Sequence, residues 1–372
     1  MNEVSILNSS FVTALGDTAQ SIEMIEKENI SLGKEEILAF DGKTTIPYYH
    51  LKTRVQNNIE SIYAALKKEV KKATNNLSSE QKKRTCIIVG SSMINWHLVF
   101  NLDEFYQNKP YSSAKATTDY YSERLSKELG LSGFSMSIAT ACTASANAVI
   151  EVGNLIKAGV FDYGIAVGLE IASDIMSSGF YAMQLLAKEE IKPFDTNREG
   201  IILGESISVL LLGKEPSSWK LLGASSSSNG VNVTSANEDG SDFYEVMQQA
   251  LENANISPRQ ITAIKAHATA TVLNDQAELL ATKMIFSPDT PICAIKPYIG
   301  HNVGGCGVVE IGVFMGCVDK GFLPASITTR THMDENYRVL TCKKTVHEGI
   351  FMMNYFGFGG NNTSLIIQKA AK

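Results

Sequence analysis

Several features that would point to other classes of protein are missing from this sequence. None of its six cysteines forms a CxxC pair, and all lie in apolar or glycine-rich surroundings, which argues against a disulfide framework or zinc site. No uncharged apolar run approaches the ~18 residues that span a bilayer, and the first residues lack a signal-peptide pattern. A net charge of −6 argues against broad binding to nucleic acids or anionic membranes. These absences predict a cytoplasmic protein with reduced thiols.

What the chain does have is enough apolar sequence for a large core, with 44% hydrophobic residues over 372 positions. Short apolar runs, several of them separated by helical patterns, predict α/β layers with largely buried sheets. The runs expected to form strands are Cys86–Val89, Ser135–Ala139, Tyr163–Val167, Ile207–Leu212, Ile264–Ala266, Ile292–Ile295, Ile350–Asn354 and Ser364–Ile367. A lysine-rich helix is expected over 57–75, with the lysines interpreted as a solvated face.

Two parts of the chain echo each other. SMSIATACTASANAVIEVGNLIKAG and PICAIKPYIGHNVGGCGVVEIGVFMG both have the pattern of a strand, a tight corner and a small-residue helix. FDYGIAVGLE and GESISVLLL likewise resemble GIFMMNYFGFGG and NTSLII. The echo predicts an internal duplication with halves at 1–213 and 214–372 in one compact unit, although two generic α/β units would also produce it.

Three residues at predicted strand ends are candidates for chemistry. Cys142 precedes a small-residue helix, whose N-terminal dipole and free amides favour a thiolate; the alternative is a buried cysteine that only packs. His267 and His301 each follow a strand among small residues, where structural histidines are also common. Their combination favours an active site, because strand ends converge at one edge of α/β sheets.

Two glycine- or serine-rich segments are candidate loops near such a site. NYFGFGGNN interleaves glycines with Phe356 and Phe358, so its backbone can approach a ligand and its amides can stabilise an oxyanion; ordinary turn-plus-core packing is the alternative. The segment Ser225–Asp242 is expected to be a long loop, either a connector or a lid.

Taken together, five segments in order resemble motifs of the β-ketoacyl-[acyl-carrier-protein] synthases of the thiolase superfamily. They are SMSIATACTASANA, KPFDTNREGIILGESISVLLL, IKAHATATVLNDQAE, IKPYIGHNVGGCGVVE and NYFGFGGNNTSLII. The resemblance implies a thiolase-like α/β fold whose duplicated halves, one with Cys142 and the other with His267 and His301, form a layered α-β-α-β-α sandwich. The short chain favours a polyketide or aryl-polyene type enzyme over a fatty-acid elongating one.

The resemblance also implies roles for individual residues. Cys142 matches the acyl-accepting nucleophile, and His267 and His301 match the histidines that act on the malonyl unit. The remaining residues matched to family positions are the supporting pair Lys296 and Glu310, the gate Phe358, whose amide forms the oxyanion hole with that of Cys142, and the pantetheine-binding Thr269 and Thr271.

Three further expectations rest on the same resemblance. Ala268 stands where the family usually retains glycine, and its methyl group is expected to tighten the pantetheine channel. Thr234 and Ser235 are expected in a mobile entrance loop. Lys52 and Arg54 are expected at a helix entry near the tunnel mouth, where an acidic carrier protein would dock.

The implied activity is decarboxylative Claisen condensation of an acyl thioester with a malonyl-carrier protein in fatty-acid or polyketide synthesis, without a metal or redox cofactor. Phosphopantetheine arrives on the carrier protein, and the enzyme is expected to be a homodimer or a heterodimer with a related subunit. One alternative is a chain-length-factor-like partner with little activity, although such subunits usually lack the cysteine. Another is a thiolase or acyltransferase, although thiolases favour a second catalytic cysteine.

Overall fold

The computed structural model describes residues 3–39, 42–93, 118–229 and 237–371. Its strands are β1 Ser5–Thr13, β2 Gly16–Asp17, β3 Gly33–Ala39, β4 Gly42–Tyr48, β5 Thr85–Gly90, β6 Ser135–Ile138, β7 Tyr163–Glu170, β8 Ser206–Gly213, β9 Trp219–Ser228, β10 Ile261–Lys265, β11 Ile292–Cys293, β12 Phe322–Leu323, β13 Lys344–Thr345, β14 Gly349–Phe356 and β15 Asn361–Lys369. Its helices are α1 Thr18–Glu26, α2 Ile59–Ala73, α3 Ser79–Lys82, α6 Tyr120–Leu129, α7 Ala144–Lys157, α8 Asp174–Ala182, α9 Ser241–Ala254, α10 Val272–Ile285, α11 Lys296–Ile299 and α12 Cys306–Asp319, with 3-10 turns η2 Ala141–Thr143, η3 Pro258–Gln260 and η4 Val303–Gly305.

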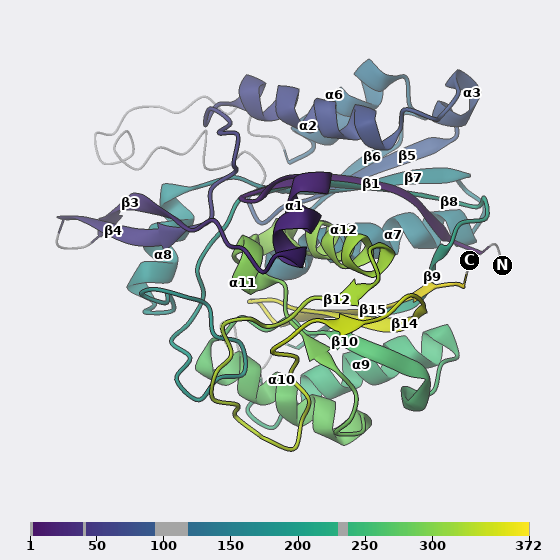
Figure 1. The fold of residues 1–372 in the computed structure, drawn as a ribbon. Helices are drawn as coiled ribbons and strands as arrows, with labels where there is room; N and C mark the ends of the chain where they lie inside the picture. Colours follow the sequence, from purple (N-terminus) through teal and green to yellow (C-terminus); the bar gives the residue numbers. More distant parts are fainter. Residues whose placement is uncertain (1–2, 40–41, 94–117, 230–236, 372) are drawn as a thin grey trace.

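The main sheet folds back on itself to make two layers. Its strand order is β11-β10-β14-β15-β9-β1-β8-β7-β5-β6, and β1 joins β9 through only two residue pairs, Ser5 with Lys220 and Ile6 with Trp219. Figure 1 shows the halves on either side of a central layer of α1, α7, α11 and α12, with α2, α3 and α6 outside one half and α9 and α10 outside the other. The expected α-β-α-β-α sandwich is therefore confirmed.

The central helix α12 and the sheet strand β7 that contacts it are buried along almost their whole length. All eight residues of β7 are buried, and 12 of the 14 residues of α12 are buried, as expected for elements covered on both faces. Helices α7 and α12 cross so closely that a Cβ added at Gly307 would lie 2.2 Å from the backbone nitrogen of Ala146. Small residues at this crossing bring the N-terminal ends of the two helices together.

The two halves use equivalent elements. In one half, the edge strand β6 leads into α7 and pairs with β5; in the other, the edge strand β11 leads through α11 and η4 into α12 and pairs with β10. Each half then has an antiparallel pair, β7 with β8 and β14 with β15. The correspondence agrees with the duplicated fold expected from the sequence, while the division at residue 213 stays a prediction.

Two long strands, β1 and β9, are absent from the sequence prediction. The loop expected over Ser225–Asp242 is wrong at both ends, because β9 continues to Ser228 and pairs with β15, and α9 begins at Ser241. Serine has low β-propensity, but the side-chain amide of Asn361 donates hydrogen bonds to Ser226 and Ser227 and supplements the backbone ladder. Thr234 and Ser235 lie outside the described residues.

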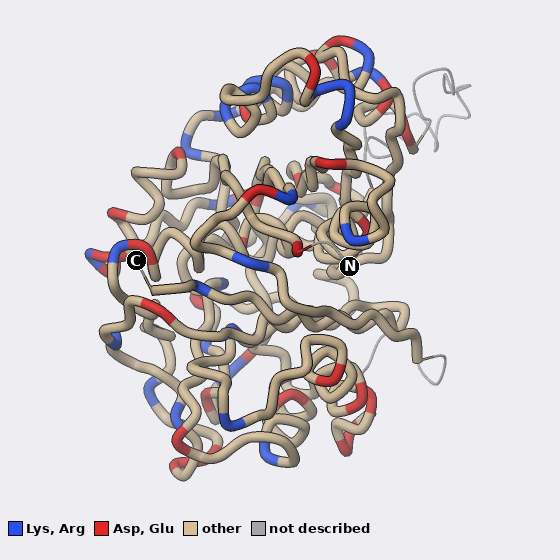
Figure 2. The backbone as a smooth tube through the Cα atoms, turned by 90° about the vertical axis from the view of Figure 1, so that its right-hand side faces the viewer, with Lys and Arg blue, Asp and Glu red and all other residues tan. Residues whose placement is uncertain are grey.

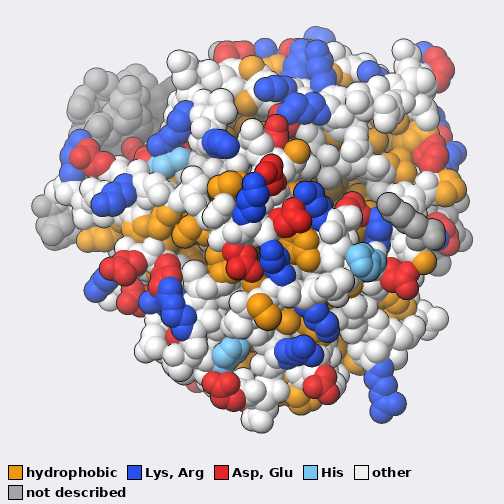
Figure 3. All heavy atoms as spheres, viewed as in Figure 1, with side chains coloured by type: hydrophobic (Ala, Val, Ile, Leu, Met, Phe, Trp, Pro, Cys, Tyr) orange, Lys and Arg blue, Asp and Glu red, His pale blue; other side chains and the backbone are white. Residues whose placement is uncertain are grey.

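The outer helices carry the charged surface. The lysine-rich helix α2 is confirmed, and its lysines face solvent or pair with acids, as Lys67 does with Glu128 and Lys72 does with Glu69. Figure 2 shows Lys and Arg next to Asp and Glu in this layer, and Figure 3 shows both signs interspersed over one face of the molecule. Within the described ranges, no helix is long and apolar enough to cross a membrane.

Candidate active site

Cys142 lies in the tight turn between β6 and α7. Ala141 before it has φ +50°, a left-handed conformation that costs an alanine ~1–2 kcal/mol, and α7 begins two residues after the cysteine. Burial raises the pKa of the Cys142 thiol to about 12, against the opposing effects of Lys296 and the backbone N–H of Phe358. The thiol is therefore protonated at neutral pH and needs a base to become a nucleophile.

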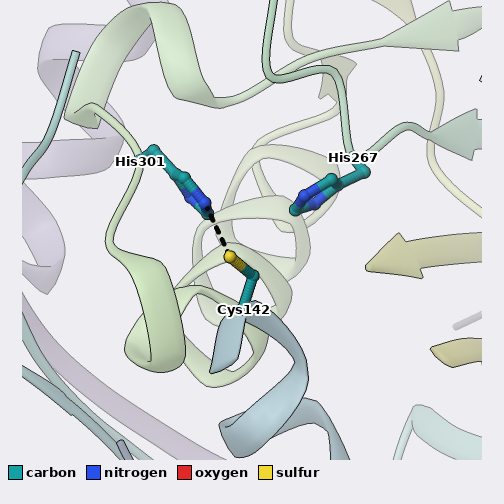
Figure 4. Close-up of side chains that lie close together, drawn as sticks. All are labelled: Cys142, His267 and His301. Atoms are coloured by element: carbon teal, nitrogen blue, oxygen red, sulfur yellow. Dashed lines mark hydrogen bonds between the residues drawn. The ribbon is translucent and has the colours of Figure 1, made fainter. Parts of the chain in front are cut away.

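Two imidazole rings lie beside this thiol (Figure 4). The Nε2 atom of His301 lies 3.1 Å from the Sγ atom of Cys142, and the His267 ring is 5.4 Å from the His301 ring at an angle of 84°. The sulfur and one nitrogen of each ring all lie within 4.8 Å of one another. Burial, reinforced by Lys296, lowers the pKa of both histidines well below their usual value, so both rings are neutral.

The His301 ring has one free nitrogen. Its Nδ1 atom has no hydrogen-bond partner among the described residues, so no neighbour fixes which nitrogen carries the proton. With the proton on Nδ1, Nε2 can accept the proton of the Cys142 thiol; with the proton on Nε2, the ring can donate to a substrate oxygen. His301 is therefore suited both to act as a base and to donate a hydrogen bond.

His267, in contrast, is held by a buried lysine. The ammonium group of Lys296 donates to the His267 carbonyl oxygen at 2.6 Å and to Glu310 Oε1 at 2.7 Å, and it lies 3.4 Å from His267 Nδ1. An ammonium group only donates, so Nδ1 accepts and Nε2 carries the ring proton. Lys296 and Glu310 are 1% exposed, which fits the expected supporting pair.

The NYFGFGGNN segment also reaches the sulfur. The backbone N–H groups of Phe358 and Cys142 both lower the pKa of the Cys142 thiol, against the effect of burial. Their role as oxyanion donors stays a prediction. The half-buried Phe358 ring stacks on Phe180 with centroids 5.7 Å apart, and the next residue, Gly359, has φ +84°. Asn361 fixes the segment to α7, because its side-chain oxygen accepts from Asn147 at 2.8 Å.

A cavity of about 310 Å³ opens onto these groups. The Cys142 sulfur and both histidines line it, as do Thr269 and Thr271, whose hydroxyl oxygens lie 3.0 Å apart. The residues that complete its wall are largely apolar and include Phe180, Ile201, Phe243, Phe356 and Phe358. The cavity therefore brings the expected nucleophile, histidines, gate and pantetheine-binding threonines to one place.

The structure bears on two further expectations from the resemblance, at Ala268 and at Lys52 and Arg54, and carrier docking at Lys52 and Arg54 stays a prediction. Ala268 does not line the cavity; it is fully buried in an apolar cluster with φ +52°, so its methyl group points into packing and does not narrow a channel. A glycine would adopt this φ without strain. Lys52 and Arg54 lie before α2, which begins at Ile59, and neither lines the cavity; Arg54 instead contacts His50 and Glu205.

Sequence reasoning also missed buried charges around the histidines. The Glu278 side chain accepts hydrogen bonds from the backbone N–H groups of His267 and Ala268 at 2.7 and 2.8 Å. Lys265, two residues before His267, is fully buried and pairs with Glu310. The sequence signal that could have identified Lys265 as a buried charge is its position inside an otherwise apolar predicted strand. The atoms of Cys142, His267 and His301 are also close enough to ligate an ion such as Zn²⁺.

Comparison with known proteins agrees with this geometry. A family model described as the β-ketoacyl synthase N-terminal domain matches residues 49–217, and the C-terminal domain model matches residues 220–330. Two Arabidopsis thaliana proteins, the chloroplastic 3-oxoacyl-[acyl-carrier-protein] synthases II and I, are 29% and 30% identical over 79% and 77% of this chain. The matches span 59% and 66% of those two proteins.

A solved structure extends the likeness to nearly the whole chain. A ketosynthase in complex with its chain length factor from Xenorhabdus doucetiae matches with a TM-score of 0.87 and 25% identity, over 99% of this chain and 98% of that one. The two family models together cover well over half of the sequence, in the expected order. The chain therefore belongs to the β-ketoacyl synthase family.

Proposed function

We propose that the protein is a β-ketoacyl-[acyl-carrier-protein] synthase, an acyltransferase that condenses an acyl thioester with a malonyl thioester and releases carbon dioxide. The observation that carries the proposal is the thiol of Cys142 hydrogen-bonded to His301, with His267 beside them, at the wall of one cavity. The names of the Arabidopsis relatives support it.

The first half-reaction transfers the acyl group to the cysteine. His301 Nε2 takes the thiol proton while the Cys142 sulfur attacks the acyl carbonyl, and the amides of Cys142 and Phe358 hold the oxyanion. When the tetrahedral intermediate collapses, the carbon–sulfur bond to the carrier breaks. The departing thiolate takes the proton back from His301, so the protein ends this step as a neutral thioester.

The second half-reaction makes the carbon–carbon bond. The bond to the malonyl carboxylate breaks, carbon dioxide leaves, and the electron pair forms an enolate whose oxygen accepts from His267 Nε2 and His301. The enolate carbon attacks the acyl thioester, the bond between the acyl carbon and the Cys142 sulfur breaks, and the sulfur leaves as a thiolate. This thiolate takes up one proton from solvent, which balances the negative charge that the malonyl carboxylate brought. Thr269 and Thr271 bind the pantetheine arm. These steps use no metal or redox group.

The proposal includes two kinds of partner, a carrier protein and a second subunit with the same fold. The outer edge of β6 has no partner strand among the described residues, and Phe134 just before it is 40% exposed beside Phe161. An open strand edge with apolar flanks favours pairing with another chain. Native mass spectrometry will distinguish a homodimer from a heterodimer with a chain-length-factor-like subunit. The cytoplasmic location stays a prediction.

An acyl-transfer assay tests the activity. The protein is mixed with an acyl-carrier protein and the Cys142 peptide is measured by mass spectrometry, with Cys142→Ala as the test variant and Cys342→Ser as the matched control at an exposed thiol. We expect an acyl adduct on the parent and on Cys342→Ser, none on Cys142→Ala, and a β-ketoacyl product after malonyl-carrier protein is added. A folded parent that takes no acyl group would favour a partner subunit without activity.

A further inference from the structure

Lys265 is a buried lysine that the mechanism above does not use. It is the last residue of β10, its side chain is 0% exposed, and it donates to Glu310 Oε2 at 2.5 Å and to the Asn354 carbonyl oxygen at 2.8 Å. The Tyr355 ring centroid lies 3.6 Å from its Nζ atom. A buried charge is costly unless its partners satisfy it, so this arrangement is a specific feature of the interior.

The partners of Lys265 connect it to the active site through one carboxylate. Glu310 binds Lys265 through Oε2 and Lys296 through Oε1, so each oxygen holds a different ammonium group. Lys296 has three N–H donors. One is used by Glu310, which leaves one for the His267 carbonyl oxygen and one for its Nδ1 atom.

Without Lys265, Glu310 Oε2 would be a buried acceptor with no donor. The carboxylate would then turn both oxygens toward Lys296, which is the nearest cation, or take up a proton. The first change draws the Lys296 ammonium group away from His267 Nδ1, and the second weakens the ion pair with Glu310 that holds Lys296 in place. The His267 ring would lose the neighbour that keeps its proton on Nε2.

We propose that Lys265 is a positioning residue for the decarboxylation step: it holds Glu310 so that Lys296 fixes His267 with the Nε2 proton facing the enolate oxygen. The role rests on the proposed function. It also predicts that Lys265 affects the two half-reactions unequally, because acyl transfer uses the hydrogen bond between His301 and Cys142. The charge of Lys265 also helps to lower the pKa of His267, which keeps this imidazole ring neutral.

The test compares Lys265→Met with Lys265→Arg and with a matched control, Lys369→Met. Lys369 is a second buried lysine, 7% exposed and paired with Asp319, in β15 away from the cavity. We expect Lys265→Met to lower kcat for malonyl decarboxylation ~10–100-fold with KM unchanged, while acyl loading of Cys142 stays within ~threefold. Lys265→Arg should recover most of the rate, and Lys369→Met should change only the melting temperature.

Imidazole ¹⁵N NMR gives a readout that does not depend on activity. The parent should show His267 in its Nε2–H tautomer, and Lys265→Met should show a mixture of tautomers. Should Lys265→Met not fold, Lys265→Gln, which is neutral and one atom shorter, takes its place. Its amide can still donate to Glu310, so we expect changes in the same direction but smaller. An unchanged His267 tautomer, or equal losses in both half-reactions, would overturn the proposal. A parent that performs neither half-reaction would instead refute the proposed function, and the NMR comparison would still decide the role of Lys265.

Discussion

Replacing His301 with alanine should slow acyl loading far more than replacing His267. With a thiol pKa of about 12, only about one Cys142 in 10⁵ is a thiolate at pH 7, so the sulfur depends on a base during attack. His301 Nε2, 3.1 Å from Sγ, is placed to be that base. A positioned base typically contributes ~10²–10⁴-fold, or ~3–5.5 kcal/mol in the barrier. We expect a loss of that size for His301→Ala.

His267→Ala is the matched control, because it removes a second buried, neutral imidazole from the same cavity. No hydrogen bond joins His267 to the sulfur among the described contacts, so acyl loading should fall less than ~10-fold while malonyl decarboxylation falls ~10²–10⁴-fold. The family resemblance implied that both histidines act on the malonyl unit, and the geometry now separates their roles in acyl loading. Rapid-quench single-turnover mass spectrometry measures both steps; equal loading rates in the two variants would refute the assignment of His301 as the base.

Three further substitutions test Phe358 in the glycine-rich loop, Ala268 in the turn after His267, and the buried carboxyl group of Glu170. Phe358→Ala should still accept an acyl group on Cys142 but should lose condensation. Because the ring is half-buried, the loss of stability should be below the ~3–5 kcal/mol typical of a fully buried phenylalanine. A much lower melting temperature together with loss of both half-reactions would contradict this. Ala268→Gly should leave KM for pantetheine thioesters unchanged in steady-state assays. It should alter the free energy of unfolding by less than ~1 kcal/mol, because the backbone strain relieved at φ +52° offsets the added entropy of the unfolded chain. A lower KM would show that the methyl group does narrow the channel. Burial raises the pKa of Glu170 from 4.5 to about 7 in the native state. Between pH 4.5 and 7 the native state therefore keeps a proton that the unfolded state releases, and the stabilisation from this proton is lost as the pH rises through that window. Relative to Glu170→Gln, the free energy of unfolding should therefore fall by up to ~3 kcal/mol over that window in denaturant titrations and stay level above pH 7. A constant difference would mean that Glu170 is ionised throughout.

The sequence was informative where the chemistry is local. A cysteine at a strand-to-helix corner, histidines after strands and a glycine-rich loop can each be identified from a short segment, and all three kinds of feature meet in the cavity. The two longest of the strands missing from the prediction, β1 and β9, pair with strands far along the chain. The serines of β9 form a strand because β15 supplies a ladder and Asn361 supplies hydrogen bonds.

The buried charges were missed for a related physical reason. A lysine in an apolar strand is costly in isolation, and Lys265 is tolerated because distant residues satisfy it, above all Glu310, which lies 45 residues later in the chain and supplies an oxygen at 2.5 Å. No local pattern carries that pairing. The same holds for Ala268, where the sequence shows an added methyl group but not the direction in which a left-handed turn points it.

The meeting of Cys142 and His301 follows from the duplicated architecture. Each lies just before a central helix, Cys142 before α7 and His301 before α12, at corresponding corners of the two halves. The helices cross where Gly307 leaves no room for a side chain beside Ala146, so the two corners are brought within hydrogen-bonding distance. A larger residue at this crossing would separate the thiol from its base without touching either one. The small residues that follow Cys142 and His301 in the sequence are therefore as much a condition for the chemistry as the reactive side chains themselves.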